Sequence, residues 1–163
     1  MVARKLVGPI AAMLVVGAAG TGLIKQSEGT RYKSYLDEAG IPTICTGHTG
    51  PEVKLGQYAT KEECDKLLKQ DLLRHSAAVS RCVNYTLTQY QYDAVVSFTF
   101  NVGETAFCRS TMARKINAGD LQGASAEFPK WNKVRINGKL VVSPGLSARR
   151  ERERELFEGK VPK

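Results

Sequence analysis

One stretch of the chain, from Ser27 to His48, constrains the fold most strongly. Glu28 is followed directly by Gly29, and this order predicts a helix that ends there. Gly40 predicts a turn, and the β-branched residues after it favour a returning strand; these residues are Thr43, Ile44 and Thr46. The stretch therefore predicts a helix end that faces a β-hairpin.

The same stretch carries side chains suited to one kind of chemistry: Glu28, Asp37 nine residues later, and Thr43 six residues after that. Glycoside hydrolysis uses two carboxyl groups, one that protonates the leaving oxygen and one that drives attack at the anomeric carbon. We expect Glu28, kept neutral by partial burial, to be the general acid, and Asp37 and Thr43 to hold the attacking water. The alternative is that these are ordinary turn carboxylates and a strand threonine.

Several separate motifs resemble one known family. The spacing E-x8-D-x5-T, followed by I-C-T-G-H-T-G, resembles the catalytic signature of the phage-type lysozymes, glycoside hydrolase family 24. Other segments resemble the family in the same order; they are Thr60 to Leu72, Val96 to Gly103, Ser110 to Asp120, and G-L-S-A-R-R-x-x-E near Gly145. The resemblance spans residues 25–159.

The resemblance implies an α+β, mainly helical lysozyme-like fold, with a small β-hairpin lobe, a larger helical lobe and a cleft between them. It implies hydrolysis of the β-1,4 bond between N-acetylmuramic acid and N-acetylglucosamine in peptidoglycan. Inversion is the expected outcome, because room for a water between the carboxyl groups favours it. It implies no cofactor.

The resemblance also implies roles for residues outside the first stretch. His48 is expected to pair with Asp71 on the next long helix, as a structural contact. An arginine near the C-terminus is expected to meet Glu28, and both Arg149 and Arg150 are candidates. Asn101 is a candidate substrate contact, and a helix C-cap is its alternative role.

The net charge of +8 favours anionic partners, which include nucleic acid, anionic lipid and acidic wall polymers. Positive charges alternate with acids from Arg149 to Glu155, as on a solvated helix, and no basic arm or stacking-aromatic signature is present. We therefore expect no nucleic-acid partner. The length of 163 residues suits one domain, which we expect to be monomeric.

The four cysteines, Cys45, Cys64, Cys82 and Cys108, have no C-x-x-C spacing, and the two histidines form no compact ligand pattern with them. We expect no metal. An even count fits two disulfides and an oxidising compartment, and buried free thiols are the alternative. Neighbourhood along the chain favours Cys45–Cys64 and Cys82–Cys108 among three possible pairings.

The N-terminus carries Arg4 and Lys5, and the nineteen residues from Leu6 to Ile24 hold no charge. That length nearly spans a bilayer, and the preceding basic residues predict a cytoplasmic N-terminus. Three interpretations are open: a signal peptide cleaved near Ala18, a stable anchor, or a signal-arrest-release segment that leaves the membrane intact. The last is found in a subset of phage lysozymes that this N-terminus resembles, and we favour it because its glycines and alanines bury little area.

This interpretation divides the chain into a membrane segment, residues 1–25, and a catalytic domain, residues 26–163. It predicts an exported enzyme held by residues 6–24 at the host inner membrane, facing the periplasm, and then released. Glu28 lies only four residues beyond Ile24, so the tethered form is expected to be inactive. No cysteine precedes Cys45, which leaves topology rather than disulfide exchange as the control.

Local signals predict the remaining helices. Thr60 with Glu63, and Thr88 with Gln91, form capping boxes, and a helical stripe that includes Tyr92, Val95, Val96, Thr99 and Phe100 predicts core. Asn137-Gly138 predicts a hairpin. For Trp131 a core position is favoured over stacking on sugar.

Two other function classes fit parts of the sequence. The chain could be a catalytically inactive wall- or membrane-binding protein that keeps a lysozyme fold, although the intact E-D-T set argues against this. Alternatively, its basic C-terminal helix could disrupt membranes without catalysis.

Overall fold

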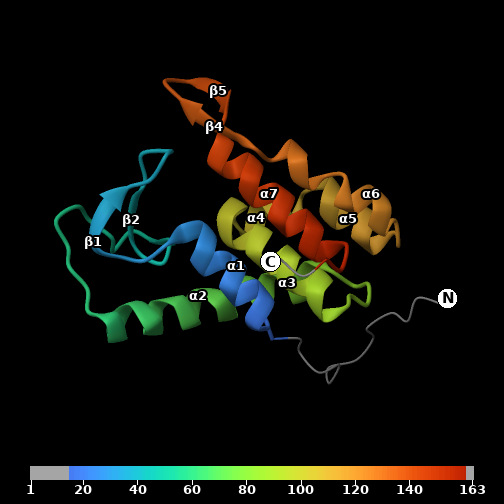
Figure 1. Ribbon diagram of the computed structural model, residues 1–163, viewed down its shortest axis with the longest axis horizontal. Helices are drawn as coiled ribbons and strands as arrows, with labels where there is room; N and C mark the ends of the chain where they lie inside the picture. The colour runs from blue at the N-terminus through green and yellow to red at the C-terminus, as the bar shows by residue number, and fades with distance from the viewer. Residues whose placement is uncertain (1–14, 161–163) are drawn as a thin grey trace.

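The computed structural model describes residues 15–160 and contains a small antiparallel sheet beside a larger set of helices (Figure 1). The helices are α1 (Ala18–Glu28), α2 (Lys61–Cys82), α3 (Gln89–Val102), α4 (Glu104–Cys108), α5 (Thr111–Asn117), α6 (Leu121–Ser125), the 3-10 helix η1 (Phe128–Lys130) and α7 (Pro144–Phe157). The strands are β1 (Arg31–Leu36), β2 (Pro42–Cys45), β3 (His48–Thr49), β4 (Lys133–Ile136) and β5 (Lys139–Val142). This is the predicted α+β class.

The small sheet follows α1 almost without a linker. Its strands lie in the order β1-β2-β3, all antiparallel. Tyr35 pairs with Thr43 and Leu36 with Pro42, so the turn that contains Gly40 closes the hairpin. Gly40 has a φ of 78°, a backbone conformation that favours glycine. The helix end and the hairpin that the sequence predicted are both present.

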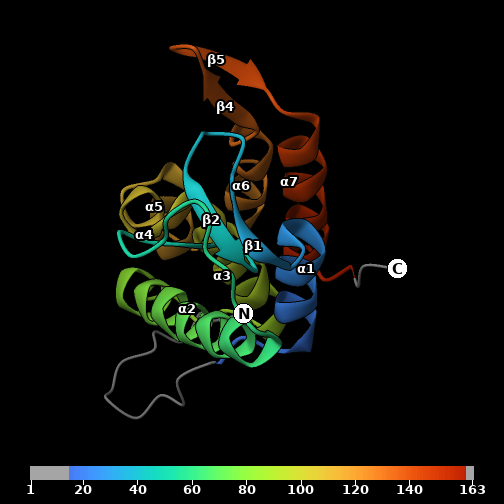
Figure 2. The same cartoon turned by 90° about the vertical axis from the view of Figure 1, so that its left-hand side faces the viewer.

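Helix α3 forms the centre of the helical part. Every residue from Tyr92 to Phe100 is buried, so α3 is covered on all sides rather than along one stripe. Helices α1, α2 and α7 pack against it, and Figures 1 and 2 show α1 and α7 side by side. The elements that hold Glu28 and the C-terminal arginines are therefore fixed against the same central helix.

Capping boxes start the two longest helices, as predicted. The Thr60 hydroxyl accepts the Glu63 N–H at the start of α2, and the Thr88 hydroxyl accepts the Gln91 N–H at the start of α3. The predicted Asn137-Gly138 turn joins β4 to β5, and both residues have positive φ. This hairpin extends away from the helices (Figure 2).

Two disulfides attach other elements to α2. Cys45 of β2 is joined to Cys64 near the start of α2, with the Cα atoms 5.0 Å apart. Cys82 at the end of α2 is joined to Cys108 of α4, with the Cα atoms 5.4 Å apart. These are the pairs that neighbourhood along the chain favours.

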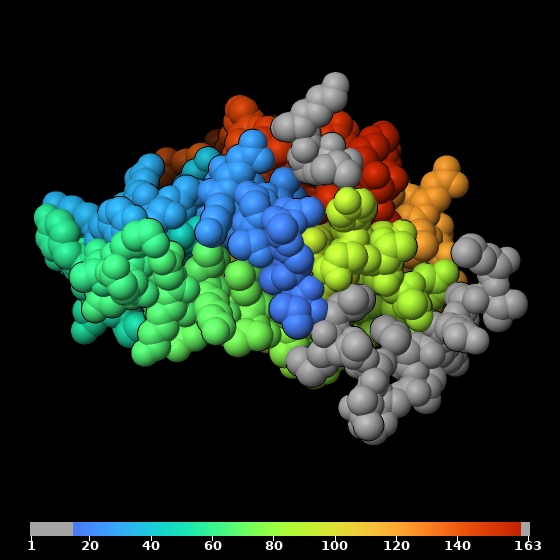
Figure 3. All heavy atoms as spheres, turned by 60° about the horizontal axis from the view of Figure 1, so that its bottom comes forward, coloured from blue at the N-terminus to red at the C-terminus, as the bar shows by residue number. Residues whose placement is uncertain are grey.

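The end of the uncharged N-terminal segment is part of α1 and packs in the core. Leu23 and Ile24 are 2% and 0% exposed. Buried Asp93 of α3 accepts the backbone N–H of Gly17 at 2.8 Å and that of Gly20 at 3.0 Å, and so caps the start of α1. A Cβ on Gly20 would lie 2.8 Å from the Cβ of Asp93, so the two helices approach closely there. Figure 3 shows α1, in blue, beside the yellow-green of α3.

None of the helices in residues 15–160 has the length and apolar character needed to cross a membrane. The first part of the predicted membrane segment, which includes Arg4 and Lys5, lies outside the described residues. Helix α1 runs through the domain boundary expected at residue 25.

Candidate active site

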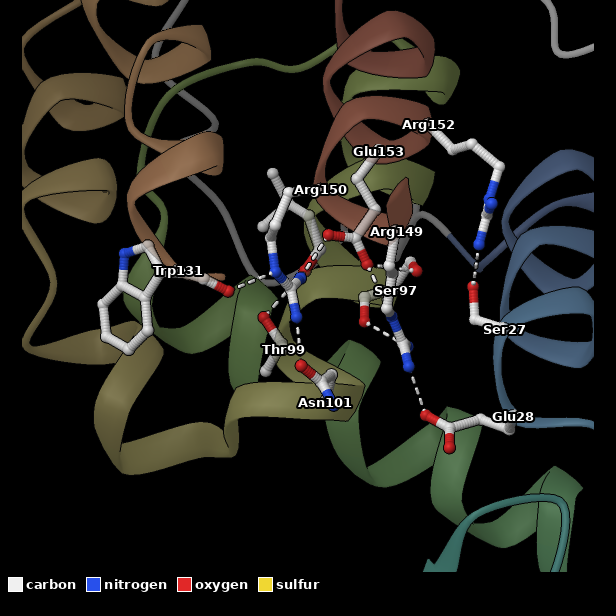
Figure 4. Close-up of polar contacts among 11 residues, drawn as sticks. Ser27, Glu28, Ser97, Thr99, Asn101, Trp131, Arg149, Arg150, Arg152 and Glu153 are labelled. Carbon is white, nitrogen blue, oxygen red and sulfur yellow. Dashed lines mark hydrogen bonds and ion pairs between the residues drawn. The ribbon is translucent and has the colours of Figure 1, made fainter. Parts of the chain in front are cut away.

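The Glu28 side chain lies at the end of α1 and is largely buried. Its side chain is 18% exposed, and its carboxylate Oε1 accepts a hydrogen bond from Arg149 Nη1 of α7. The next residue, Gly29, has a φ of 65° and turns the chain into β1. Helix α1 therefore presents the Glu28 carboxyl to α7 and to the start of the sheet (Figure 4).

The turn between β2 and β3 approaches the same carboxyl through Gly47. A Cβ at this position would lie 2.7 Å from Cδ and from Oε2 of Glu28, so any other residue here would require the Glu28 carboxyl to move. Gly47 also has a φ of 70°. The space for the Glu28 carboxyl thus depends on a glycine in the T-G-H motif.

Asp37 and Thr43 both lie in the β1–β2 hairpin. Asp37 Oδ1 accepts the backbone N–H groups of Ala39 and Ile41 at 2.9 and 2.8 Å. The buried Thr43 hydroxyl donates to the Ile41 carbonyl at 2.9 Å. Both side chains are therefore oriented by the same turn, although among the described residues neither hydrogen-bonds to Glu28.

Tyr35 links the two carboxyl groups electrostatically. Burial raises the pKa of its phenol most, and the charge of Glu28 raises it further. Arg31 lowers this pKa and Asp37 raises it, and the net shift is upward. The Arg31 guanidinium lies 4.2 Å from the centre of the Tyr35 ring. The phenol is thus a neutral hydrogen-bond donor within the electrostatic reach of both acids.

His48 connects β3 to α2 through the expected contact. Its Nδ1 lies 2.7 Å from Oδ2 of buried Asp71, and its Nε2 lies 2.8 Å from Oε1 of Glu52. Burial lowers the pKa of His48, but the hydrogen bonds and charges of Asp71 and Glu52 outweigh it, and the pKa is raised. The pair holds the hairpin part to the long helix.

The two candidate arginines have different partners. Arg149 contacts Glu28, whereas Arg150 donates from Nε to the Trp131 carbonyl at 2.9 Å and from Nη2 to the Asn101 side-chain oxygen. Asn101 lies in the last turn of α3, and Gly103 is the C-cap, so the alternative role of Asn101 as the cap is wrong. A substrate contact by Asn101 stays a prediction.

Trp131 is half-buried and packs against the helical core. Its ring lies edge-on to Phe98, with the ring centres 5.4 Å apart. This position fits the core role that the sequence favoured.

A sequence model described as phage lysozyme matches residues 25–153 of the chain, which include Glu28, Asp37, Thr43 and Arg149. The chain belongs to the phage lysozyme family. Relatives with known names cover most of it. An endolysin of Acyrthosiphon pisum secondary endosymbiont phage 1 is 43% identical over 143 residues, 88% of this chain and 97% of the relative. A SAR-endolysin of Escherichia phage Mu is 42% identical over 131 residues, 74% of this chain and 76% of the relative.

Solved structures show the same phage lysozyme fold. An endolysin from the Escherichia coli O157:H7 phage FAHEc1 superposes with a TM-score of 0.81 at 37% identity, covering 91% of this chain and 96% of that chain. Membership of the family identifies the chain as a muramidase-type hydrolase.

Sequence reasoning missed three members of this phage lysozyme site: Gly47, Tyr35 and Glu153. Gly47 lies within the I-C-T-G-H-T-G motif, and a glycine between strands signals a close backbone approach. Glu153 closes the R-R-x-x-E motif. The alternating charges around it predicted a solvated helix, and this is wrong for Arg149, Arg150 and Glu153, which are buried. No group of three or more metal-ligating side chains gathers in residues 15–160.

Proposed function

We propose that this chain is an endolysin that hydrolyses the β-1,4 bonds between N-acetylmuramic acid and N-acetylglucosamine in peptidoglycan. The observation that carries the proposal is the Glu28 carboxyl, which is largely buried at the junction of α1, the β2–β3 turn and α7. Phage lysozyme membership supports the same assignment. The net charge of +8 suits an acidic wall polymer.

In the proposed reaction Glu28 gives its proton to the glycosidic oxygen as the bond to the leaving sugar breaks. Asp37 and Thr43 orient a water on the opposite face, and Asp37 takes its proton as the water attacks the anomeric carbon. This single displacement inverts the anomeric configuration. Asp37 is suited to the role because both backbone N–H groups donate to Oδ1, and within residues 15–160 no hydrogen bond occupies Oδ2, which can accept from water.

The proposal predicts that Glu28→Gln abolishes lysis of outer-membrane-permeabilised cells while the protein stays folded, because the amide has no proton to give. Turbidity measures lysis, and thermal unfolding by circular dichroism checks the fold. Glu62→Gln, on the exposed start of α2, is the matched control and should stay fully active. Lysis by folded Glu28→Gln would instead support membrane disruption without catalysis.

The stereochemistry has its own test. NMR of the first product formed from a β-linked oligosaccharide should show the α-anomer, as inversion requires. The β-anomer as first product would overturn the role given to Asp37 and Thr43 and leave hydrolysis itself intact.

The N-terminal segment is proposed to control this activity by its position. Residues 18–24 form the first two turns of α1, and Leu23 and Ile24 are core residues, so they cannot lie in lipid and pack in the core at the same time. A membrane-held chain would therefore lack the packing that holds α1, and with it Glu28, against α3. Names of relatives such as the SAR-endolysin of phage Mu support this interpretation.

Replacing Ala11 and Ala12 by leucine should strengthen membrane retention without touching α1. The expected result is a chain in the membrane fraction that does not lyse its host and regains muramidase activity in detergent. Full activity of the membrane-held form would contradict control by topology.

We expect the released enzyme to be a periplasmic monomer, which analytical ultracentrifugation can test.

A further inference from the structure

Glu153 of α7 is a fully buried acid at the centre of a polar cluster behind Glu28 (Figure 4). Its Oε1 accepts from the Ser97 hydroxyl at 2.8 Å and from Arg149 Nε at 3.0 Å. Its Oε2 accepts from Arg150 Nη1. Each carboxylate oxygen therefore has a partner, and two of the three partners carry a positive charge.

Arg149 donates hydrogen bonds to two acids, Glu153 and Glu28. Its Nε is held by Glu153, its Nη2 donates to the Ser97 carbonyl at 3.1 Å, and only Nη1 reaches Glu28. The Arg149 side chain is 5% exposed, and burial lowers its pKa less than Glu153 and Glu28 raise it. Arg149 is therefore a permanent cation in a fixed orientation.

This arrangement bears on a difficulty in the proposed chemistry. A cation beside a carboxyl favours its ionised form, whereas a general acid must hold a proton when the sugar binds. If Glu28 were the sole partner of Arg149, the guanidinium could form two parallel hydrogen bonds to the Glu28 carboxylate and stabilise its ionised form. Because Glu153 occupies Nε and supplies a compensating negative charge, Glu28 receives one hydrogen bond from a partly neutralised partner.

We propose that Glu153 is a positioning residue that fixes Arg149 and offsets its charge, and so sets the highest pH at which Glu28 still acts as an acid. This inference rests on the proposed role of Glu28. Glu153 itself does not reach the substrate.

Other charged and polar groups surround the pair on the elements packed against it. Arg150 on α7 is bound to Glu153, and Arg152 on α7 donates to Ser27 of α1 at 3.5 Å. Tyr35 on β1 feels the charge of Glu28, with Arg31 and Asp37 beside it. Helix α3 contributes the uncharged Ser97 and Asn101. Glu153 is the acid that contacts Arg149 directly from the side opposite Glu28.

The test is the pH dependence of hydrolysis of purified peptidoglycan by Glu153→Gln. Removing the negative charge leaves the Arg149 cation uncompensated beside Glu28, so the variant should lose activity at lower pH than the unaltered protein. The alkaline pH of half-maximal activity should fall by about half a unit or more, because even modest charge effects are of that size. Glu127→Gln is the matched control, since Glu127 is a buried acid paired with Lys115 and Lys130. Its profile should coincide with that of the unaltered protein.

A profile of Glu153→Gln that coincides with that of the unaltered protein, or moves to higher pH, overturns the proposal. A loss of activity that is equal at every pH also overturns the proposal, because a purely structural role of Glu153 predicts that result. If Glu153→Gln does not fold, Glu153→Asp keeps the charge that pairs with Arg150 but withdraws the shorter carboxylate from Arg149 Nε. It should show a smaller downward shift, and an unmoved profile again overturns the proposal.

Failure of this inference can be distinguished from failure of the proposed function. If folded Glu28→Gln is active, Glu28 is not the general acid, and the inference about Glu153 fails with it. If Glu28→Gln is inactive but the pH profile of Glu153→Gln is unmoved, only the role of Glu153 is wrong.

Discussion

At the scale of single residues, the surroundings of Glu28 are set by groups of very different kinds. Gly47 makes room by having no side chain, Arg149 supplies a fixed positive charge, and Tyr35 supplies a neutral phenol. Arg149 of α7 and Gly47 of the β2–β3 turn approach the carboxyl directly, and Tyr35 of β1 lies within its electrostatic range. A change in any one should alter the site without removing the carboxyl.

Gly47→Ala should reduce both stability and activity. The positive φ disfavours alanine by about 1–2 kcal/mol, and the new Cβ would displace the Glu28 carboxyl. Misplacing a reacting group costs rate steeply, so we expect activity to fall about tenfold or more. Urea unfolding and peptidoglycan hydrolysis measure the two effects.

Gly56→Ala serves as the control for Gly47→Ala. Gly56 has a φ of 90°, but a Cβ on this residue would meet nothing within 4 Å, so the variant carries the backbone strain without the contact to Glu28. It should lose stability and keep activity per folded molecule. Equal activity losses in the two variants would contradict the role given to Gly47.

At the scale of elements, α1 depends on α3 for its start and on α7 at its end. The carboxylate of Asp93 accepts two N–H groups of the first turn of α1, which no side chain within α1 caps. Arg149 meets the last residue of the same helix. Because the helix is short, tethering at both ends fixes the position of Glu28 along its axis.

Asp93→Ala should therefore lower the free energy of unfolding by about 1–2 kcal/mol, the loss expected for a helix N-cap. Activity should disappear at a lower temperature, because α1 carries Glu28. Asp120→Ala is the control: Asp120 caps α6 through the Gly123 N–H at 2.8 Å, away from α1. It should affect stability without changing the ratio of activity to folded protein. An unchanged melting temperature for Asp93→Ala would show that the cap is dispensable.

At the scale of the whole molecule, α2 connects the sheet to the helical part. The Cys45–Cys64 disulfide and the His48–Asp71 pair join the sheet to α2, and the Cys82–Cys108 disulfide joins the far end of α2 to α4. The β1–β2 hairpin carries Asp37 and Thr43, whereas α1 and α7 carry Glu28 and Arg149. The relative placement of the proposed catalytic groups thus depends on contacts to α2.

The raised pKa of His48 predicts a pH dependence of stability. The charged pair with Asp71 contributes fully below the ordinary histidine pKa of 6.5 and is lost as pH rises through the raised pKa of the folded state. Urea unfolding of the unaltered protein and of His48→Asn should differ more at about pH 5.5 than at about pH 8.5. His75, whose pKa burial and Arg74 lower to about 4, acts oppositely but equally in both proteins. A difference that does not depend on pH would contradict the charged pair.

The sequence by itself determined the features that depend on neighbouring residues. Capping boxes at Thr60 and Thr88, the Asn137-Gly138 turn and the end of α1 at Glu28 were all predicted correctly. The physical reason is that the hydrogen bonds of a cap or a turn join residues only a few positions apart, so the local sequence decides whether they form. The resemblance to phage lysozymes supplied the candidate acids in the same way, from fixed short spacings.

Only the tertiary structure decided which distant groups meet. Arg149 and Arg150 are adjacent in the sequence but point about 100° apart on α7, so the rotation of that helix against α3 selects Arg149 for Glu28 and Arg150 for Asn101. The same packing buries Glu153 between the two arginines and brings Asp93 to the start of α1. The partners of Glu28 and of Gly17 lie 121 and 76 positions away along the chain, so they are fixed by the packing of whole helices rather than by any local pattern.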